Sequence, residues 1–182
     1  MVNITSVSDK REIGINLFFS KVGFYISLLK PRVMSLSIFT SFVGMIIAPG
    51  FITIYEGALI ILAISIGSGA SGALNMWYER KTDLLMERTK NRVLPMGLIS
   101  SKGALIYGIT LSVFSIYLLY YVANFLSASI LLVTILYYIF VYTVWLKKRT
   151  PQNIVIGGAA GAFPPIIGWT AVTGSISPEI SL

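Results

Sequence analysis

The sequence predicts an all-α, polytopic transmembrane helix bundle with about five membrane helices. Apolar residues make up 55% of the 182 residues and charged residues only 12%, which is too few for the surface of a soluble globule. Long stretches carry no charge at all, and a spanning helix needs about 20 apolar residues. The chain has no cysteine and no histidine, which excludes disulfides, thiolate metal sites and histidine-based catalysis.

The N-terminal segment, residues 1–30, is basic and contains a short apolar stretch that Lys21 interrupts. We expect this segment to lie on the cytoplasmic side and to contain a helix in the membrane interface. No small-residue cleavage site follows the stretch, so no signal peptide is expected. The membrane domain is expected to occupy residues 31–182.

The membrane helices are expected where uncharged stretches reach the length of a span. Their approximate positions are 33–48, 52–74, 103–122, 125–146 and 154–173. The uncharged stretch 103–146 is long enough for two helices, and Tyr120, Tyr121 and Asn124 at its midpoint are typical of an interfacial turn. Small residues near the end of the second helix permit close helix packing or close approach of a ligand.

All 14 basic residues fall in the N-terminal segment, in residues 75–102 or in residues 147–149. We therefore expect these three regions to face the cytoplasm, and the chain to be a multi-pass membrane protein. The net charge of +7 is explained by this topology and by the lipid bilayer as partner. It gives no indication of nucleic acid binding.

A polar or acidic residue recurs at every fourth position where the second helix leaves the membrane, at Asn75, Glu79 and Asp83, and again at Glu87. This spacing places the side chains on one helix face with a rise of about 6 Å between neighbours. Two carboxylates and an amide suit Mg²⁺, which proteins commonly hold through one or two carboxylates together with substrate phosphates. We predict that Glu79 and Asp83 bind Mg²⁺, with Asn75 beside them.

Three cations, Arg88, Lys90 and Arg92, follow the acids closely. Such a cluster could bind a diphosphate group. The alternative is a solvated, positively charged loop with incidental ion pairs, and charge alone favours the two interpretations equally.

These residues resemble a known motif. Asn75-x3-Glu79-x3-Asp83, followed by Arg88-Thr-Lys-Asn-Arg92-Val-Leu-Pro95, is similar to the first acidic motif of the intramembrane aromatic prenyltransferase superfamily. The stretches Leu29-Lys-Pro-Arg-Val-Met34 and 143–174 resemble, within it, the protohaem IX farnesyltransferase (haem O synthase) family. The resemblance runs from about Leu28 to the end of the chain.

The resemblance implies nine membrane helices around a central cavity, with two acidic motifs on cytoplasmic loops. Together with the distribution of basic residues it implies a cell inner membrane, with the mitochondrial inner membrane as the alternative. It implies transfer of a farnesyl group from farnesyl diphosphate to a vinyl group of haem B, giving haem O for terminal oxidases, with Mg²⁺ as cofactor and haem B as substrate. Asn75, Glu79 and Asp83 would be the catalytic metal–diphosphate motif, and Arg88, Lys90 and Arg92 would contact phosphate. A second polar loop would receive haem propionates or the diphosphate, unless it serves only topology and helix capping. Its residues are Lys147, Lys148, Arg149, Gln152 and Asn153.

The sequence departs from the family pattern in two places. Glu79 stands where aspartate is usual, and the second acidic motif has no counterpart before Leu182. We therefore expect the membrane domain to be C-terminally incomplete, as a fragment or as one piece of a split enzyme with a C-terminal half chain as partner. The alternatives are a prenyltransferase for another aromatic acceptor, such as a quinone precursor, and an inactive or non-enzymatic membrane remnant.

Overall fold

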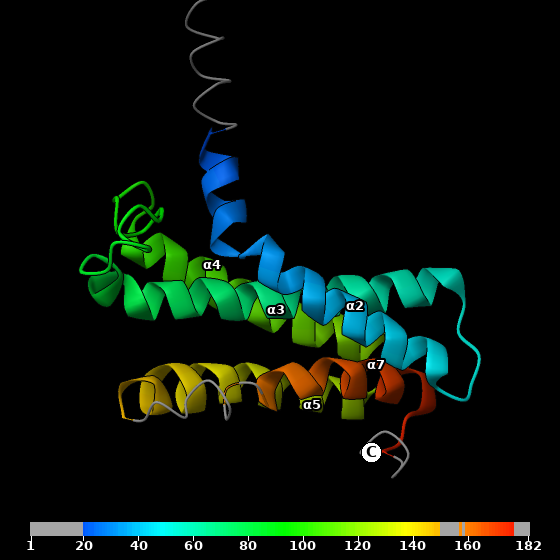
Figure 1. Ribbon diagram of the computed structural model, residues 1–182. Helices are drawn as coiled ribbons and strands as arrows, with labels where there is room; N and C mark the ends of the chain where they lie inside the picture. Colours follow the sequence, from blue (N-terminus) through cyan, green and yellow to red (C-terminus); the bar gives the residue numbers. More distant parts are fainter. Residues whose placement is uncertain (1–19, 150–156, 158, 177–182) are drawn as a thin grey trace, which may run out of the picture.

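The computed structural model describes residues 20–149, 157 and 159–176, and every regular element in these ranges is helical (Figure 1). The all-α prediction is confirmed for this part of the chain. A helical segment, Ser20–Leu28, is bent by 55° against the helix that follows it. The other elements are α2 (Pro31–Ile47), α3 (Ile54–Asp83), α4 (Ser101–Val122), α5 (Phe125–Leu136), the π-helix η1 (Tyr137–Trp145), the 3-10 helices η2 (Leu146–Lys148) and η3 (Ala159–Ala162), and α7 (Phe163–Thr173).

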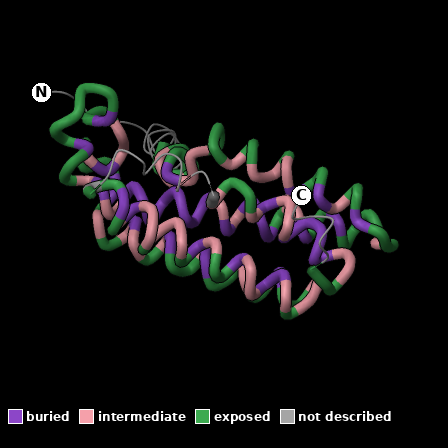
Figure 2. The backbone as a smooth tube through the Cα atoms, turned by 60° about the horizontal axis from the view of Figure 1, so that its bottom comes forward, coloured by how far each residue is buried: buried purple, intermediate pink, exposed green. Residues whose placement is uncertain are grey.

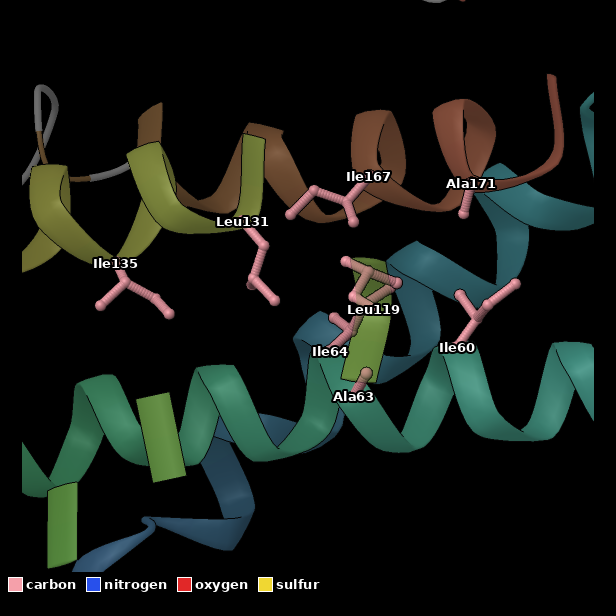
Figure 3. Close-up of a cluster of buried hydrophobic side chains, with 8 residues drawn as sticks. All are labelled: Ile60, Ala63, Ile64, Leu119, Leu131, Ile135, Ile167 and Ala171. Atoms are coloured by element: carbon pink, nitrogen blue, oxygen red, sulfur yellow. The ribbon is translucent and has the colours of Figure 1, made fainter. Parts of the chain in front are cut away.

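The helices form two layers, with α2, α3 and α4 in one and α5 and α7 in the other (Figure 1). The largest interfaces join α3 to α4 and α2 to α7. Apolar side chains from both layers project toward one another (Figure 3). This core contains Ile60, Ala63 and Ile64 of α3, Leu119 of α4, Leu131 and Ile135 of α5, and Ile167 and Ala171 of α7.

Helix α3 is the central element of the bundle. It begins with a capping box, in which Thr53 Oγ1 accepts from the Glu56 amide and the Glu56 carboxylate accepts from the Thr53 amide. Its 30 residues extend about 45 Å, roughly 15 Å more than the hydrocarbon core requires. Buried residues concentrate along the interior of the bundle, whereas the outer helix faces are exposed (Figure 2). Helix α3 is therefore long enough to carry its polar last turns, including Asn75 to Asp83, beyond the membrane core.

Helices α2 and α7 cross at backbone contact. A Cβ atom added at Gly44 would lie 2.2 Å from the carbonyl oxygen of Pro165, and one added at Gly168 would lie 2.1 Å from that of Ser41. Both positions therefore require glycine for this crossing. The crossing closes the bundle by joining its first layer to its second.

A helix lies at each of the five predicted positions, but three of these helices differ from the expected form. The second runs on to Asp83, so the loop that follows it is shorter than residues 75–102. The fourth changes from α-helix to π-helix at Tyr137. The fifth was expected from residue 154; its described part includes the 3-10 helix η3 and then α7, which begins at Phe163, where Pro164 and Pro165 favour an α-helix start. Residues 154–156 and 158 lie outside the described part.

Three described helices are long and apolar enough to cross a membrane: Ile54–Asp83, Ser101–Val122 and Phe125–Trp145. The bent pair formed by Ser20–Leu28 and α2 could be a fourth span. The protein is thus a multi-pass membrane protein. In the N-terminal helical segment Leu28 is buried, and Phe24 and Tyr25 pack near α3 and α4. Its location in the membrane interface stays a prediction.

Candidate active site

Asn75, Glu79 and Asp83 lie one helical turn apart at the end of α3, as the four-residue spacing predicts. All three are buried, with exposed fractions of 2%, 8% and 3%. A buried carboxylate is costly unless it is paired with a cation and hydrogen-bonded. The site must therefore contain groups that compensate these charges.

Each of the three side chains meets a basic group from a different segment. Lys30 Nζ, in the bend before α2, donates to Asn75 Oδ1 at 2.5 Å. Arg92 Nη1, in the loop after α3, donates to Asp83 Oδ2 at 2.8 Å. Lys147, in the 3-10 helix η2, forms an ion pair with Glu79. Segments far apart in sequence therefore converge on one face of α3; we call the three pairs the polar ladder.

The loop after α3 is anchored so that Arg92 stays beside Asp83. Thr89, which is buried, donates its hydroxyl to the backbone oxygen of Asp83 at 3.0 Å. Leu94 and Ile99 are buried in a second apolar cluster that includes Leu28. These contacts hold the loop against the end of α3.

The Lys30–Asn75 pair of the polar ladder is also connected to η1. Asn75 Nδ2 donates to Thr143 Oγ1 at 3.0 Å, and Thr143 Oγ1 donates to the Tyr138 backbone oxygen at 2.8 Å. Asn75 thus links the bend before α2 to the π-helix.

Lys30 combines a rare backbone conformation with a perturbed charge. Its φ of 53° is the only positive value at a non-glycine position among the described residues. It lies in the bend between Ser20–Leu28 and α2, outside both helices, and burial lowers the pKa of its ammonium group from 10.5 to about 8. The nearby charge of Arg92 lowers this pKa further, while Glu79 opposes the shift. The surroundings of Lys30 therefore disfavour its charged form relative to an exposed lysine.

An apolar cavity of about 330 Å³ opens beside the polar ladder, between α2, α3, α5 and α7. Lys30 and Tyr138 line it near the ladder, and Ile64 and Ile167 line it within the apolar core. Along α3, Ile64 precedes Asn75 by eleven residues, or about 16 Å. Other lining residues are Met34, Ser37, Gly67, Ser68, Ser71 and Leu131. The arrangement suits an amphipathic ligand with a charged head and a long apolar tail.

The donor set fits Mg²⁺ when a ligand supplies further oxygens. Within the described ranges no group of three or more acidic residues could hold a metal ion by itself. Two carboxylates and an amide oxygen are instead what Mg²⁺ uses together with phosphate oxygens and water. Three basic groups face two carboxylates in the ladder, so it carries excess positive charge. This excess favours an anionic ligand.

The structure distributes the other predicted site residues unevenly. Arg88 is exposed, and Lys90 pairs at 2.6 Å with the exposed Glu87 instead of pointing to the ladder. Arg149 is exposed. The side chain of Lys148 and residues Gln152 and Asn153 lie outside the described part.

Sequence reasoning missed Lys30, Thr143 and Tyr138 as site residues. Of these three residues, only Lys30 could have been noticed in the sequence. It precedes Pro31, and a residue before proline disfavours the right-handed helical conformation, so Lys30 marks the start of α2. Thr143 and Tyr138 lie in an apolar helix and have no distinguishing pattern.

Comparisons with known proteins show which family the chain belongs to. A family model described as the UbiA prenyltransferase family matches residues 37–182. A protoheme IX farnesyltransferase of Pelagibacter ubique is 56% identical over 180 residues, which cover 98% of this chain and 58% of that protein. One from Sinorhizobium fredii is 56% identical over 155 residues, covering 85% of this chain and 49% of that protein.

Solved structures share the fold. A UbiA homolog from Archaeoglobus fulgidus bound to GPP and Mg²⁺ matches with a TM-score of 0.71 and 18% identity, covering 86% of this chain and 56% of that one. The same homolog bound to DMAPP and Mg²⁺ gives a TM-score of 0.72, 19% identity and coverages of 85% and 56%. The chain spans about half the length of the relatives it matches. It belongs to the UbiA prenyltransferase family.

Proposed function

We propose that this chain provides the prenyl diphosphate site of a membrane prenyltransferase that transfers a farnesyl group from farnesyl diphosphate to a vinyl group of haem B, giving haem O. The observation that carries the proposal is the polar ladder at one end of an apolar cavity. The diphosphate would lie against the ladder, and the prenyl chain would enter the cavity.

Glu79 and Asp83 would hold Mg²⁺, with Asn75 as an additional oxygen ligand. The bound ion would supply positive charge to the departing diphosphate. Arg92 and Lys147 would turn from their present partners toward the phosphate oxygens, and Lys30, still bonded to Asn75, would donate another of its three protons to them. These contacts would stabilise the charge that develops as the allylic carbon–oxygen bond breaks. The negative charges of Glu79 and Asp83 would then be compensated by the bound metal ion.

The cavity would bury the prenyl chain and keep water from the allylic cation. Burial of apolar surface is worth about 25 cal/mol per Å², so the tail would contribute most of the binding free energy and the ladder would fix its position. Lys30 and Tyr138 line the cavity where the reacting carbon would lie. The nucleophile would be the vinyl group of the acceptor.

The identity of the acceptor rests on the relatives named protoheme IX farnesyltransferase, two of which are 56% identical to this chain. Arg149, Lys148, Gln152 and Asn153 are proposed to receive the haem propionates, with Arg88 and Lys90 as secondary phosphate contacts. The basic end of the bundle is proposed to face the cytoplasm of a cell whose inner membrane holds the protein.

A chimera tests this proposal. Residues 1–182 would replace the corresponding part of the Pelagibacter ubique relative, and membranes would be supplied with haem B, farnesyl diphosphate and Mg²⁺. Haem O measured in extracts should match that of the intact relative. A chimera that inserts normally but makes no haem O would contradict the proposal, and prenylation of a hydroxybenzoate in its place would indicate a quinone-precursor acceptor.

A further inference from the structure

Three hydrogen bonds in series run from the cavity to the π-helix η1. Lys30 Nζ donates to Asn75 Oδ1 at 2.5 Å, Asn75 Nδ2 donates to Thr143 Oγ1 at 3.0 Å, and Thr143 Oγ1 donates to the Tyr138 carbonyl oxygen at 2.8 Å. We infer that Thr143 is a positioning residue that fixes the orientation of the Asn75 amide and so holds the Lys30 ammonium at the diphosphate site. Its effect on substrate binding rests on the proposed function.

The donors and acceptors allow only one arrangement. An ammonium group can only donate, so Lys30 must meet the oxygen of the Asn75 amide. The single proton of the Thr143 hydroxyl goes to the Tyr138 carbonyl, so this hydroxyl can only accept from Asn75 and must meet its NH₂ group. Both neighbours therefore select the same amide orientation, in which Oδ1 faces Lys30.

The π-helix explains why a threonine on η1 can reach α3. In an α-helix, a threonine hydroxyl bonds to the carbonyl three or four residues earlier. Thr143 instead bonds to the carbonyl five residues earlier, which is the acceptor position of the π-helical register. The wider turn leaves the same hydroxyl free to accept from Asn75. Segments of π-helix occur frequently at functional sites, and here the segment has a definable task.

Burial makes this orientation hard to lose. Thr143 is 1% exposed and Asn75 is 2% exposed, so water cannot replace a missing partner at either side chain. Thr143→Val would remove the hydroxyl at nearly constant volume. The Asn75 NH₂ group would then have no acceptor, only Lys30 would still select the amide orientation, and the amide oxygen would be held less firmly beside Lys30.

The first measurement needs no ligand. Purified 182-residue chain in detergent would be treated with an amine-reactive acylating reagent, and the labelling rate of Lys30 would be followed by mass spectrometry. Loss of a hydrogen bond to a charged group predicts that Thr143→Val raises this rate about tenfold. Thr143→Ser should label like the unmodified protein. Thr170→Val is the matched control, because Thr170 is also fully buried but its hydroxyl bonds only within α7.

The second measurement is the Kd for farnesyl diphosphate with Mg²⁺ present. Thr143→Val should weaken binding about tenfold, with Thr143→Ser and Thr170→Val unchanged. If Thr143→Val does not fold, Thr143→Ala replaces it with the same expectation.

An unchanged Lys30 labelling rate in the Thr143 variant overturns the inference, and so does an equal rise in Thr170→Val, which would indicate general loosening of the bundle. Failure of the unmodified chain to bind farnesyl diphosphate would instead count against the proposed function. In that case the labelling rates would still decide the role of Thr143, so the two failures are distinguishable.

Discussion

Lys30 should lose its charge close to pH 8, and this titration should weaken diphosphate binding. Burial and the nearby Arg92 hold its pKa at about 8, against an ordinary value of 10.5. The charged groups around it are Arg92 of the loop, Glu79 and Asp83 of α3, and Lys147 after η1. If the diphosphate needs the ammonium form, then affinity must follow the fraction of Lys30 that is protonated.

The magnitude follows from the pKa. At pH 7 about nine tenths of Lys30 is charged and at pH 9 about one tenth, so the Kd for farnesyl diphosphate should rise about tenfold over this range. Lys30→Arg stays charged throughout and should show a flat profile. The folded protein also releases this proton at lower pH than the unfolded chain, so the free energy of unfolding should rise with pH between about 8 and 10.5.

The assay is isothermal titration calorimetry with farnesyl diphosphate and Mg²⁺ at fixed ionic strength. The difference between the two profiles isolates Lys30 from every other titrating group, including those of the ligand. Identical profiles for Lys30→Arg and the unmodified protein would refute the reasoning, because Lys30 would then contribute no charge to binding.

Further predictions concern the ladder, the cavity and the helix crossing. In the chimera, Asp83→Asn should lower haem O formation more than about 10²-fold without affecting membrane insertion, and near-normal turnover would contradict this prediction. Glu79→Asp should preserve or raise haem O formation, and a large loss would contradict that. Ser68→Phe should fill the cavity and weaken farnesyl diphosphate binding about tenfold while leaving inorganic pyrophosphate binding unchanged, and equal losses for both would argue against the tail site. Gly168→Ala should separate α2 from α7 and lower the free energy of unfolding by about 1–3 kcal/mol, which would be measured as a lower Tm. Gly161→Ala is the control and should leave Tm unchanged, because a Cβ added there meets nothing within 4 Å.

The helices and the acidic face of α3 could be predicted because they depend on local pattern. Uncharged stretches of spanning length give the membrane helices, and the four-residue spacing of Asn75, Glu79 and Asp83 places them together whatever surrounds them. The close packing of α3 could likewise be anticipated from its small residues.

The partners of these residues could not be predicted, because they depend on which segments meet in space. Of the three cations after the acids, Arg92 reaches Asp83 while Lys90 turns to Glu87, and charge pattern does not separate them. The role of Thr143 depends on a π-helical register that the apolar sequence of η1 does not reveal. The position at which α7 begins follows from Pro164 and Pro165, whose effect hydropathy does not register.

The central claim is that the polar ladder and the cavity together bind a prenyl diphosphate through Mg²⁺. The most direct measurement is the Kd of the purified chain for farnesyl diphosphate, with Mg²⁺ and with EDTA, in the unmodified protein and in Asp83→Asn. We expect Mg²⁺ to tighten binding at least about tenfold in the unmodified protein and to have no effect in the variant. Equal affinity with Mg²⁺ and with EDTA, or the same Mg²⁺ effect in Asp83→Asn, would contradict the claim.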